Sequence, residues 1–294
     1  MSFQIVYHNI RELKITRGSA IALPHLNVFL PLKVYPMPKP LILVTNDDGI
    51  TAPGLRALVG YMKDLGEVVV VAPDSPQSGM GHAITLDNTL YSKKVTIDLE
   101  AGAPEEYSCS GTPADCVKLA LQELLDRRPS LCVSGINHGS NSSINVIYSG
   151  TMSAAIEAGI EGVPAIGFSL CDYSWEANFK HAELHIKNIV RESLNHGMPK
   201  GVVLNVNIPK LRAEEIKGIK VCRQARANWK EKFDKRTNPS GKDYYWLTGE
   251  FELLDKGEDT DEWALANGYI SLVPTQFDLT AHHAIQDVNN WNLL

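Results

Sequence analysis

Residues 41–54, LILVTNDDGITAPG, pass from a short apolar run into a polar loop and then to the expected start of a helix. Residues 41–44 are all apolar and predict a buried strand. Beyond the loop, Pro53 stands where the first turn of a helix tolerates its missing N–H. Apolar side chains then recur at helical spacing, at Leu55, Leu58, Val59, Met62 and Leu65. A strand, a loop and a helix in this order are the building unit of an α/β fold.

The same order of elements repeats along the chain. Apolar runs predict further strands at residues 68–72, 131–134, 163–168 and 202–208. Apolar spacing predicts helices at residues 113–125, 154–159 and 175–194, and residues 90–108 are expected to be β-rich. Such repetition predicts a mostly parallel sheet with helices on both faces. In a sheet of this kind the site lies beyond the carboxyl ends of the strands, here in the loops after residues 44, 72 and 134.

The composition of the 294-residue chain is that of an ordinary globular protein, with 44% hydrophobic and 21% charged residues. Its formal net charge of −6 argues against a protein that binds nucleic-acid duplexes through a basic face. Because the chain holds no run of about 18 apolar residues, no membrane span is expected. A chain of this charge would have to bind anions through a metal ion or through backbone N–H groups.

The five cysteines are widely spread and form no Cys-x-x-Cys pair. This pattern argues against both a disulfide scaffold and a structural zinc site. The first 20 residues carry charges where a secretory signal would need an apolar run. Together these features predict a protein of the reducing cytoplasm.

Composition divides the chain into three parts. Residues 1–40 show no clear amphipathic period and are expected to be an N-terminal extension. Met37 stands four residues before the first strand, so the functional protein is hypothesised to begin near it. Residues 41–225 carry the alternation of strands and helices and are expected to form the core. Residues 226–294 are rich in aromatic and charged residues, which predicts a β-rich extension whose hairpins pack on another subunit.

Two adjacent carboxylates, Asp47 and Asp48, follow the first strand. Burying both in the ionised form is costly unless a cation compensates their charge. Hard divalent cations such as Mg²⁺ prefer oxygen ligands of this kind. The alternative is a turn with solvated Asp side chains, because Asp-Gly is a strong turn signal.

The other two loops at the same sheet edge offer neutral oxygens. Asn137, in the loop after residue 134, supplies an amide carbonyl, and Ser78, in the loop after residue 72, supplies a hydroxyl. Both could complete a cation site begun by the two carboxylates. The alternative is that both are solvated side chains of polar loops.

Two expected helix starts, at residues 110–113 and 148–151, place hydroxyl side chains beside free N–H groups. Such ends bind anions through their N–H groups and the helix dipole. The alternative is that they are ordinary N-caps, for which Ser and Thr are common. His82 and His138 are the histidines nearest these loops, and each could act as a general acid or simply as a hydrogen-bonding group.

Together these motifs resemble the stationary-phase survival protein SurE family of metal-dependent nucleotidases. The resemblance begins with LILVTNDDGITAPG at residues 41–54. It continues in order to about residue 285, through APD (72–74), QSG (77–79), GTPAD (111–115), SGIN (134–137), GSN (139–141), YSGT (148–151), DYYWL (243–247) and GYIS (268–271). Each motif alone is weak, but the ordered set is specific. Residues 1–36 have no counterpart in the family.

The resemblance implies a Rossmann-like catalytic core at residues 41–225 that hydrolyses phosphate monoesters. The implied substrates are chiefly nucleoside 5′- and 3′-monophosphates, with short-chain polyphosphate for some members. One divalent metal ion per subunit, Mg²⁺ or Mn²⁺, is implied as the cofactor. A homodimer or homotetramer that exchanges residues 226–294 between subunits is also implied.

The family's functional residues fall on matching positions of this sequence. The implied metal ligands are two Asp, one Ser and one Asn, namely Asp47, Asp48, Ser78 and Asn137, of which both Asp are also catalytic. The implied phosphate contacts are Asn46, Ser149, Gly150 and Thr151, in a pocket also lined by Gly111 and Thr112.

The expected reaction is in-line attack on phosphorus by an activated water. The alternative makes one Asp of the pair a covalent nucleophile. Two other protein classes fit less well. A haloacid-dehalogenase-type phosphatase needs Asp-x-Asp after the first strand, but Gly49 stands two residues after Asp47. A receiver-type signalling domain needs a phospho-accepting Asp and a Lys after later strands, where this chain has Asn137 and Ser169.

Overall fold

The computed structural model describes residues 39–98 and 102–293. Residues 1–38, with nearly all of the predicted extension and the hypothesised start at Met37, lie outside the described residues. The described part opens with β1 (Leu41–Thr45), the strand predicted from the apolar run. α1 (Pro53–Met62) follows, with Pro53 in its first turn as expected.

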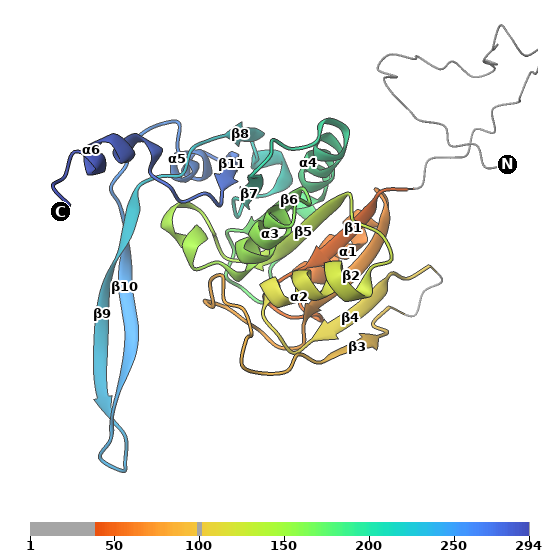
Figure 1. Cartoon of the computed structure of the whole chain (residues 1–294), viewed down its shortest axis with the longest axis horizontal. Coiled ribbons are helices and arrows are strands. Elements are labelled where there is room, and N and C mark those ends of the chain that lie inside the picture. The colour runs from red at the N-terminus through yellow and green to blue at the C-terminus, as the bar shows by residue number, and fades with distance from the viewer. Residues whose placement is uncertain (1–38, 99–101, 294) are drawn as a thin grey trace, which may run out of the picture. The chain divides into compact units, whose positions relative to one another are not determined.

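Nine strands form one sheet in the order β3-β4-β2-β1-β5-β6-β7-β11-β8 (Figure 1). On one side of β1 lie β2 (Glu67–Pro73), β4 (Glu105–Cys109) and β3 (Ser92–Val95). On the other side lie β5 (Leu131–His138), β6 (Ala165–Leu170), β7 (Val202–Ile208), β11 (Ile270–Gln276) and β8 (Ile219–Val221). Pairing is parallel from β4 through β7, whereas β3 and β11 run antiparallel to β4 and β7.

The direction in which the chain crosses the sheet reverses at β1. Leu43 is paired in parallel with Val69 of β2 on one side and with Cys132 of β5 on the other. The carboxyl end of β1 therefore lies between those of β2 and β5. This is the switch point at which open α/β sheets bind ligands, and all three predicted loops leave the sheet at this edge.

Helices cover both faces of the sheet, and alternate residues of β1 point to each face. Ile42 and Val44 belong to the core packed against α1 and α4 (Glu183–His196). Leu41 and Leu43 belong to the opposite core, against α2 (Pro113–Leu119) and α3 (Gly150–Ile160). Burial of each of these side chains stabilises the folded state by about 1.5–3 kcal/mol. The predicted Rossmann-like α/β fold is confirmed.

The predicted helix at residues 175–194 was wrong in its start, because α4 begins at Glu183. Trp175 stacks on the ring of His138, and Phe179 meets the same ring edge-on. These two aromatic residues therefore pack against the end of β5 instead of continuing the helix. Turns at residues 174–179 and one short 3₁₀ segment (Lys180–Ala182) connect them to α4.

The remaining elements are short. A π-helical segment (Ala120–Leu124) extends α2. The described chain also holds 3₁₀ segments at Ser143–Ile147, Ala213–Glu215 and His282–Ala284, and the helices α5 (Asp261–Ala266) and α6 (Ile285–Asn289).

The segment after residue 226 is only partly separate from the core. β9 (Ala227–Thr237) and β10 (Asp243–Leu253) form an antiparallel hairpin that stands away from the sheet in Figure 1. This agrees with the expected β-rich extension. However, β11 returns to the main sheet and lies between β7 and β8, so part of this segment builds the core.

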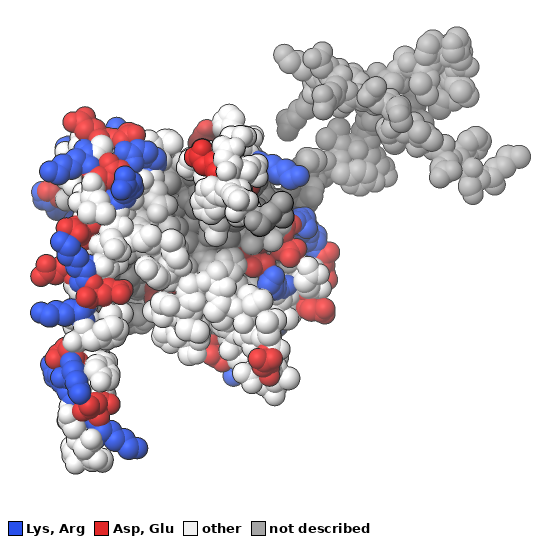
Figure 2. All heavy atoms as spheres, turned by 60° about the vertical axis from the view of Figure 1, so that its left-hand side comes forward, with Lys and Arg blue, Asp and Glu red and all other residues white. Residues whose placement is uncertain are grey.

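Lys and Arg spheres are interspersed with Asp and Glu spheres on the face shown in Figure 2, without one basic area. Within residues 39–98 and 102–293, helices fall short of the length and apolarity that crossing a membrane requires.

Candidate active site

Asp47 lies at the carboxyl end of β1 with its side chain against the start of α3. It is 4% exposed, and its Oδ1 accepts a hydrogen bond of 2.6 Å from Thr151 Oγ1. The backbone of Gly150 also packs against Asp47. A Cβ at position 150 would lie only 2.6 Å from the Cβ of Asp47. The first predicted loop and the second expected helix start therefore lie against each other.

The buried position of Asp47 disfavours its ionised form. Burial raises the pKa of Asp47 to about 6, the nearby Asp48 charge adds to the increase, and the hydrogen bond from Thr151 opposes it. Among the residues that the structure describes, no Lys or Arg forms an ion pair with either carboxylate. A bound divalent cation would supply the missing positive charge.

In the metal-free protein we expect the free energy of unfolding to decrease as pH rises from about 4 to about 6. The folded state holds the Asp47 proton up to a pKa of about 6, whereas the unfolded state releases it near 3.8. This shift of about two units corresponds to about 3 kcal/mol. Urea unfolding in EDTA across this pH range should show this decrease in the free energy of unfolding for the native protein. The decrease should be absent in Asp47→Asn, because the amide at position 47 does not titrate. Equal pH dependence in both proteins would contradict the assignment.

Asp48 is oriented by a histidine from the neighbouring strand. The Nδ1 atom of His138, at the end of β5, lies 3.1 Å from Asp48 Oδ2. Trp175 stacks on the imidazole with ring centroids 5.1 Å apart, and Phe179 packs against its edge at the same distance. His138 Nε2 is buried and has no partner in the described part of the chain. The sequence singled out His138, but only the fold reveals its partner.

The loop after β2 runs past Asp47 and reaches the start of α3. The N–H of Gln77 donates to the main-chain oxygen of Asp47 at 2.7 Å. Further along, the N–H of Gly81 donates to the carbonyl of Tyr148 at 3.3 Å. Ser78 lies between these anchors and is exposed. The structure therefore places the predicted serine in the loop beside the carboxylates.

Asn46 and Asn137 both use their amide nitrogens to hold the local backbone. Asn46 Nδ2 donates to the carbonyl of Gly49 at 3.0 Å, and Asn137 Nδ2 donates to that of Gly139 at 2.9 Å. The amide oxygen of Asn46 is buried and lacks a donor among the described residues. A free oxygen of this kind suits a cation or a water better than a phosphate oxygen. The predicted phosphate contact of Asn46 stays a prediction.

The start of α3 offers donors to an anion. Ser149 is its N-cap, and the Ser149 hydroxyl accepts from the N–H of Met152 at 3.0 Å. Helix geometry leaves the N–H groups of Gly150 and Thr151 without an intrahelical acceptor. Because the hydroxyl and the backbone N–H of Thr151 both act on the carboxylate of Asp47, the N–H of Gly150 is the donor that remains for a phosphate.

Thr112 ties the start of α2 to the loop after β2, and the predicted lining of the pocket by Gly111 and Thr112 stays a prediction. The Thr112 hydroxyl donates to the carbonyl of Ala83 at 2.7 Å and caps α2 together with Asp115. The Asp115 carboxylate also binds the backbone and side chain of Thr85. Thr112 is therefore the predicted N-cap and also an anchor for the loop after β2.

Two groups of supporting residues were missed in the sequence. Asn205 and Asn207 of β7 are buried and hold the backbone of Asn141 at 2.9 and 2.8 Å. Two Asn residues inside an otherwise apolar strand are a sequence pattern that could have indicated this supporting role. Glu157 of α3 binds His82 at 2.8 Å and so anchors the loop after β2, which no local pattern predicts.

The residues present fit a divalent cation. Within residues 39–98 and 102–293, no three His, Cys, Asp or Glu side chains gather closely enough to hold a metal ion by themselves. A cation at Asp47 and Asp48 would thus need neutral oxygen ligands such as those of Asn and Ser. A cavity of about 440 Å³ lies elsewhere, at the amino ends of β6 and β7, with a mainly apolar lining.

Comparison with known proteins gives the family. The family model described as "Survival protein SurE" matches residues 42–231. The chain belongs to the SurE family. The resemblance found in the sequence is confirmed, and the matched region holds every predicted site residue of the SurE set.

Curated SurE relatives cover most of the chain. The 5′-nucleotidase SurE of Flavobacterium psychrophilum is 69% identical over 257 residues, 87% of this chain and 99% of the relative. That of Christiangramia forsetii is 70% identical over 255 residues, 87% of this chain and 98% of the relative. The crystal structure of the SurE protein from Aquifex aeolicus matches with a TM-score of 0.73 and 42% identity, over 85% of this chain and 98% of that one.

Proposed function

We propose that the protein hydrolyses nucleoside 5′-monophosphates to nucleoside and phosphate with the help of a divalent metal ion. The contact between Asp47 and the start of α3 carries this proposal, because a carboxylate suited to a cation lies against a helix start suited to an anion. The names of the SurE relatives bear out the predicted enzyme class. The test is a panel of nucleoside monophosphates assayed with Mg²⁺, Mn²⁺ or EDTA, and turnover that persists in EDTA would reject the proposal.

Asp47, Asp48, Ser78 and Asn137 would hold one Mg²⁺ or Mn²⁺ ion per subunit. When bound, the ion would offset negative charge on the phosphoryl oxygens as the ester bond breaks. The two Asp supply most of the negative charge that attracts it. Thr151 and His138 fix the carboxylates of Asp47 and Asp48 through the hydrogen bonds described above.

The start of α3, with the backbone N–H of Gly150 as its free donor, would bind a phosphate oxygen and orient phosphorus for in-line attack by a water. One Asp of the pair would accept the proton that this water loses. We prefer water over a covalent aspartyl intermediate because one oxygen of each carboxylate already accepts or shares a hydrogen bond. A phospho-enzyme trapped by rapid quench would favour the covalent route.

Exposed aromatic rings lie next to the site and would suit a nucleobase. Trp175, stacked on His138, is 59% exposed, and Tyr173 is 76% exposed. Tyr173 lies against Gly139, because a Cβ added to that glycine would lie 2.3 Å from its ring. We propose these rings as the stacking surface that makes a nucleotide a better substrate than a simple phosphate ester.

Trp175→Ala is expected to raise KM for nucleoside 5′-monophosphates about tenfold, because base–aromatic stacking contributes about 1–3 kcal/mol per base. KM for glycerol phosphate, which has no base, should stay unchanged. Trp291→Ala is the matched control, since this indole is also exposed but lies in the C-terminal tail. Equal increases in KM for both substrates would mean that Trp175 acts through His138 and not through the base.

Nucleoside 3′-monophosphates and short-chain polyphosphate are further substrates that the family resemblance supports. Both belong in the same assay panel. We also propose that the protein works in the cytoplasm, which is supported by five cysteines that are all free thiols.

We further propose a homodimer or homotetramer that forms through residues 226–294, with residues 41–225 as the catalytic core. The hairpin exposes apolar side chains that a neighbouring subunit would cover, namely Phe233, Tyr245, Trp246 and Leu247. Sedimentation analysis of the full chain and of Trp246→Ala tests this assembly.

A further inference from the structure

The loop between β5 and α3 is tied at its centre to a segment more than a hundred residues later. One end of this loop follows Asn137, and its other end leads into Gly150 and Thr151. The N–H of Ser143, in the middle, donates to Asp261 Oδ2 at 2.8 Å, across a sequence separation of 118 residues. The loop that leads into the proposed phosphate site is therefore held by a side chain outside that site.

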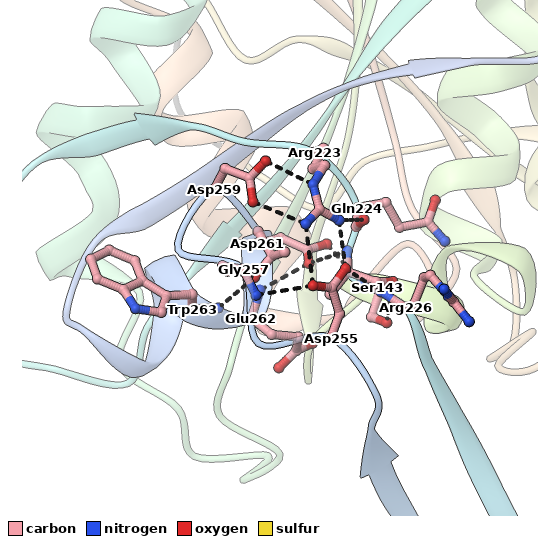
Figure 3. Close-up of polar contacts among 12 residues, drawn as sticks. Ser143, Arg223, Gln224, Arg226, Asp255, Gly257, Asp259, Asp261, Glu262 and Trp263 are labelled. Carbon is pink, nitrogen blue, oxygen red and sulfur yellow. Dashed lines mark hydrogen bonds and ion pairs between the residues drawn. The ribbon is translucent and has the colours of Figure 1, made fainter.

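Asp261 joins three backbone segments. It is the first residue of α5 and is fully buried. Its Oδ2 accepts from Ser143, while its Oδ1 accepts from the N–H groups of Ala225 and Glu262, each at 2.9 Å (Figure 3). Hydrogen bonds to a buried carboxylate are stronger than those between neutral groups. Asp261 thereby fixes the β5–α3 loop against the segment that enters the hairpin.

Ser143 has an unfavourable backbone conformation that these contacts stabilise. Its φ is +54°, in the left-handed region that costs a residue other than glycine about 1–2 kcal/mol. Besides the bond to Asp261, its hydroxyl donates to the carbonyl of Ala225 at 3.0 Å. Nearby, the indole N–H of Trp229 donates to Asn145 Oδ1 at 2.9 Å. The base of the hairpin therefore holds the loop at two places.

The loop is continuous with α3 through short-range hydrogen bonds. The N–H of Asn145 donates to Ser142, that of Tyr148 to Asn145, and that of Ser149 to Val146. A shift at Ser143 would pass through this single 3₁₀ segment to the helix start. Asp47 and Asp48 follow β1 instead and make no hydrogen bond to the segment at residues 142–147 in the described chain.

An outer pair of carboxylates lies beside Asp261 but does not touch the loop. Arg223 pairs with Asp255 and, at 2.8 Å, with Asp259 (Figure 3). Asp259 is 68% exposed, so its ion pair contributes little. Asp259 is therefore a matched comparison for Asp261, two residues away and of the same chemistry.

We propose that Asp261 is a positioning residue for the phosphate end of the site and sets the place of Gly150 and Thr151 through the β5–α3 loop. This inference rests on the proposed function, because it concerns how tightly the phosphate group of the substrate is held. It makes the base of the β9–β10 hairpin part of the machinery that determines KM.

The test compares Asp261→Asn with Asp259→Asn in the full-length protein. An Asn at position 261 can accept only through one oxygen and loses the negative charge. We expect KM for a nucleoside 5′-monophosphate and Ki for inorganic phosphate each to rise about tenfold in Asp261→Asn. The proportional change in kcat should be smaller than that in KM, and the Mn²⁺-induced increase in Tm should persist, because Asp261→Asn leaves all four proposed metal ligands in place. Asp259→Asn should change none of these values.

Trp229→Phe provides a second, milder variant, because it removes the indole donor to Asn145 and keeps an aromatic ring at this position. KM and Ki are expected to rise about threefold in this variant. If Asp261→Asn fails to fold, the KM and Ki values of Trp229→Phe test whether the base of the hairpin positions the phosphate end of the site. A lower Tm with unchanged KM and Ki would show that Asp261 is merely structural and would overturn the inference. A native protein without metal-dependent turnover would instead reject the proposed function.

Discussion

Asp47→Asn is expected to lower kcat/KM for nucleoside 5′-monophosphates by at least about 10³-fold, or about 4 kcal/mol. The substitution removes the negative charge of the most deeply buried carboxylate of the site while keeping its shape. The Thr151 hydroxyl can still donate to the amide oxygen at this position. The fold should survive, and the metal-free variant should be more stable than the native protein at neutral pH because burial of the charge is no longer required.

Steady-state kinetics and the Mn²⁺-induced change in Tm measure this effect. A cation at about 100 times its Kd stabilises a protein by about 2.7 kcal/mol, and this gain should disappear in Asp47→Asn. Asp64→Asn is the control, because Asp64 is an exposed carboxylate paired with Lys187 and should affect neither value. Normal metal-dependent turnover in Asp47→Asn would remove Asp47 from the site.

Gly150→Ala is expected to lower kcat/KM by about 10²-fold, since a displacement of about 1 Å at a reacting group can cost that much. The added Cβ would lie 2.6 Å from Asp47 Cβ and 2.8 Å from Asp47 Oδ2, so one of the two residues must move. Asp47 is almost fully buried and the backbone of α3 is held by its helix, which leaves little room for adjustment. The Mn²⁺-induced change in Tm should decrease as well.

Gly60→Ala is the matched control for this variant. Gly60 lies inside α1, and a Cβ added there would meet no atom within 4 Å. This change should leave kcat/KM unaltered and increase the free energy of unfolding by up to about 1 kcal/mol, because alanine favours a helix more than glycine. Equal kcat/KM in Gly150→Ala and the native protein would mean that the close contact with Asp47 has no role in catalysis.

Local patterns in the sequence predicted the elements that local interactions form. The apolar run before Asn46 predicted β1, Pro53 predicted the start of α1, and Thr112 was the expected N-cap of α2. The expected start of α4 was wrong, because Trp175 follows the apolar spacing but packs on His138. Apolar spacing alone does not reveal which surface an aromatic ring covers.

The sequence alone determined the family, the α/β class and the loops that hold the candidate site residues, because these depend on the order of short motifs and on local hydrophobic spacing. The tertiary structure decided which side chains meet: Asp48 with His138, Asp47 with Thr151, and Asp261 with Ser143. The physical reason is that these contacts join segments 90, 104 and 118 residues apart, and only the packed sheet and its crossovers bring such segments within hydrogen-bond distance.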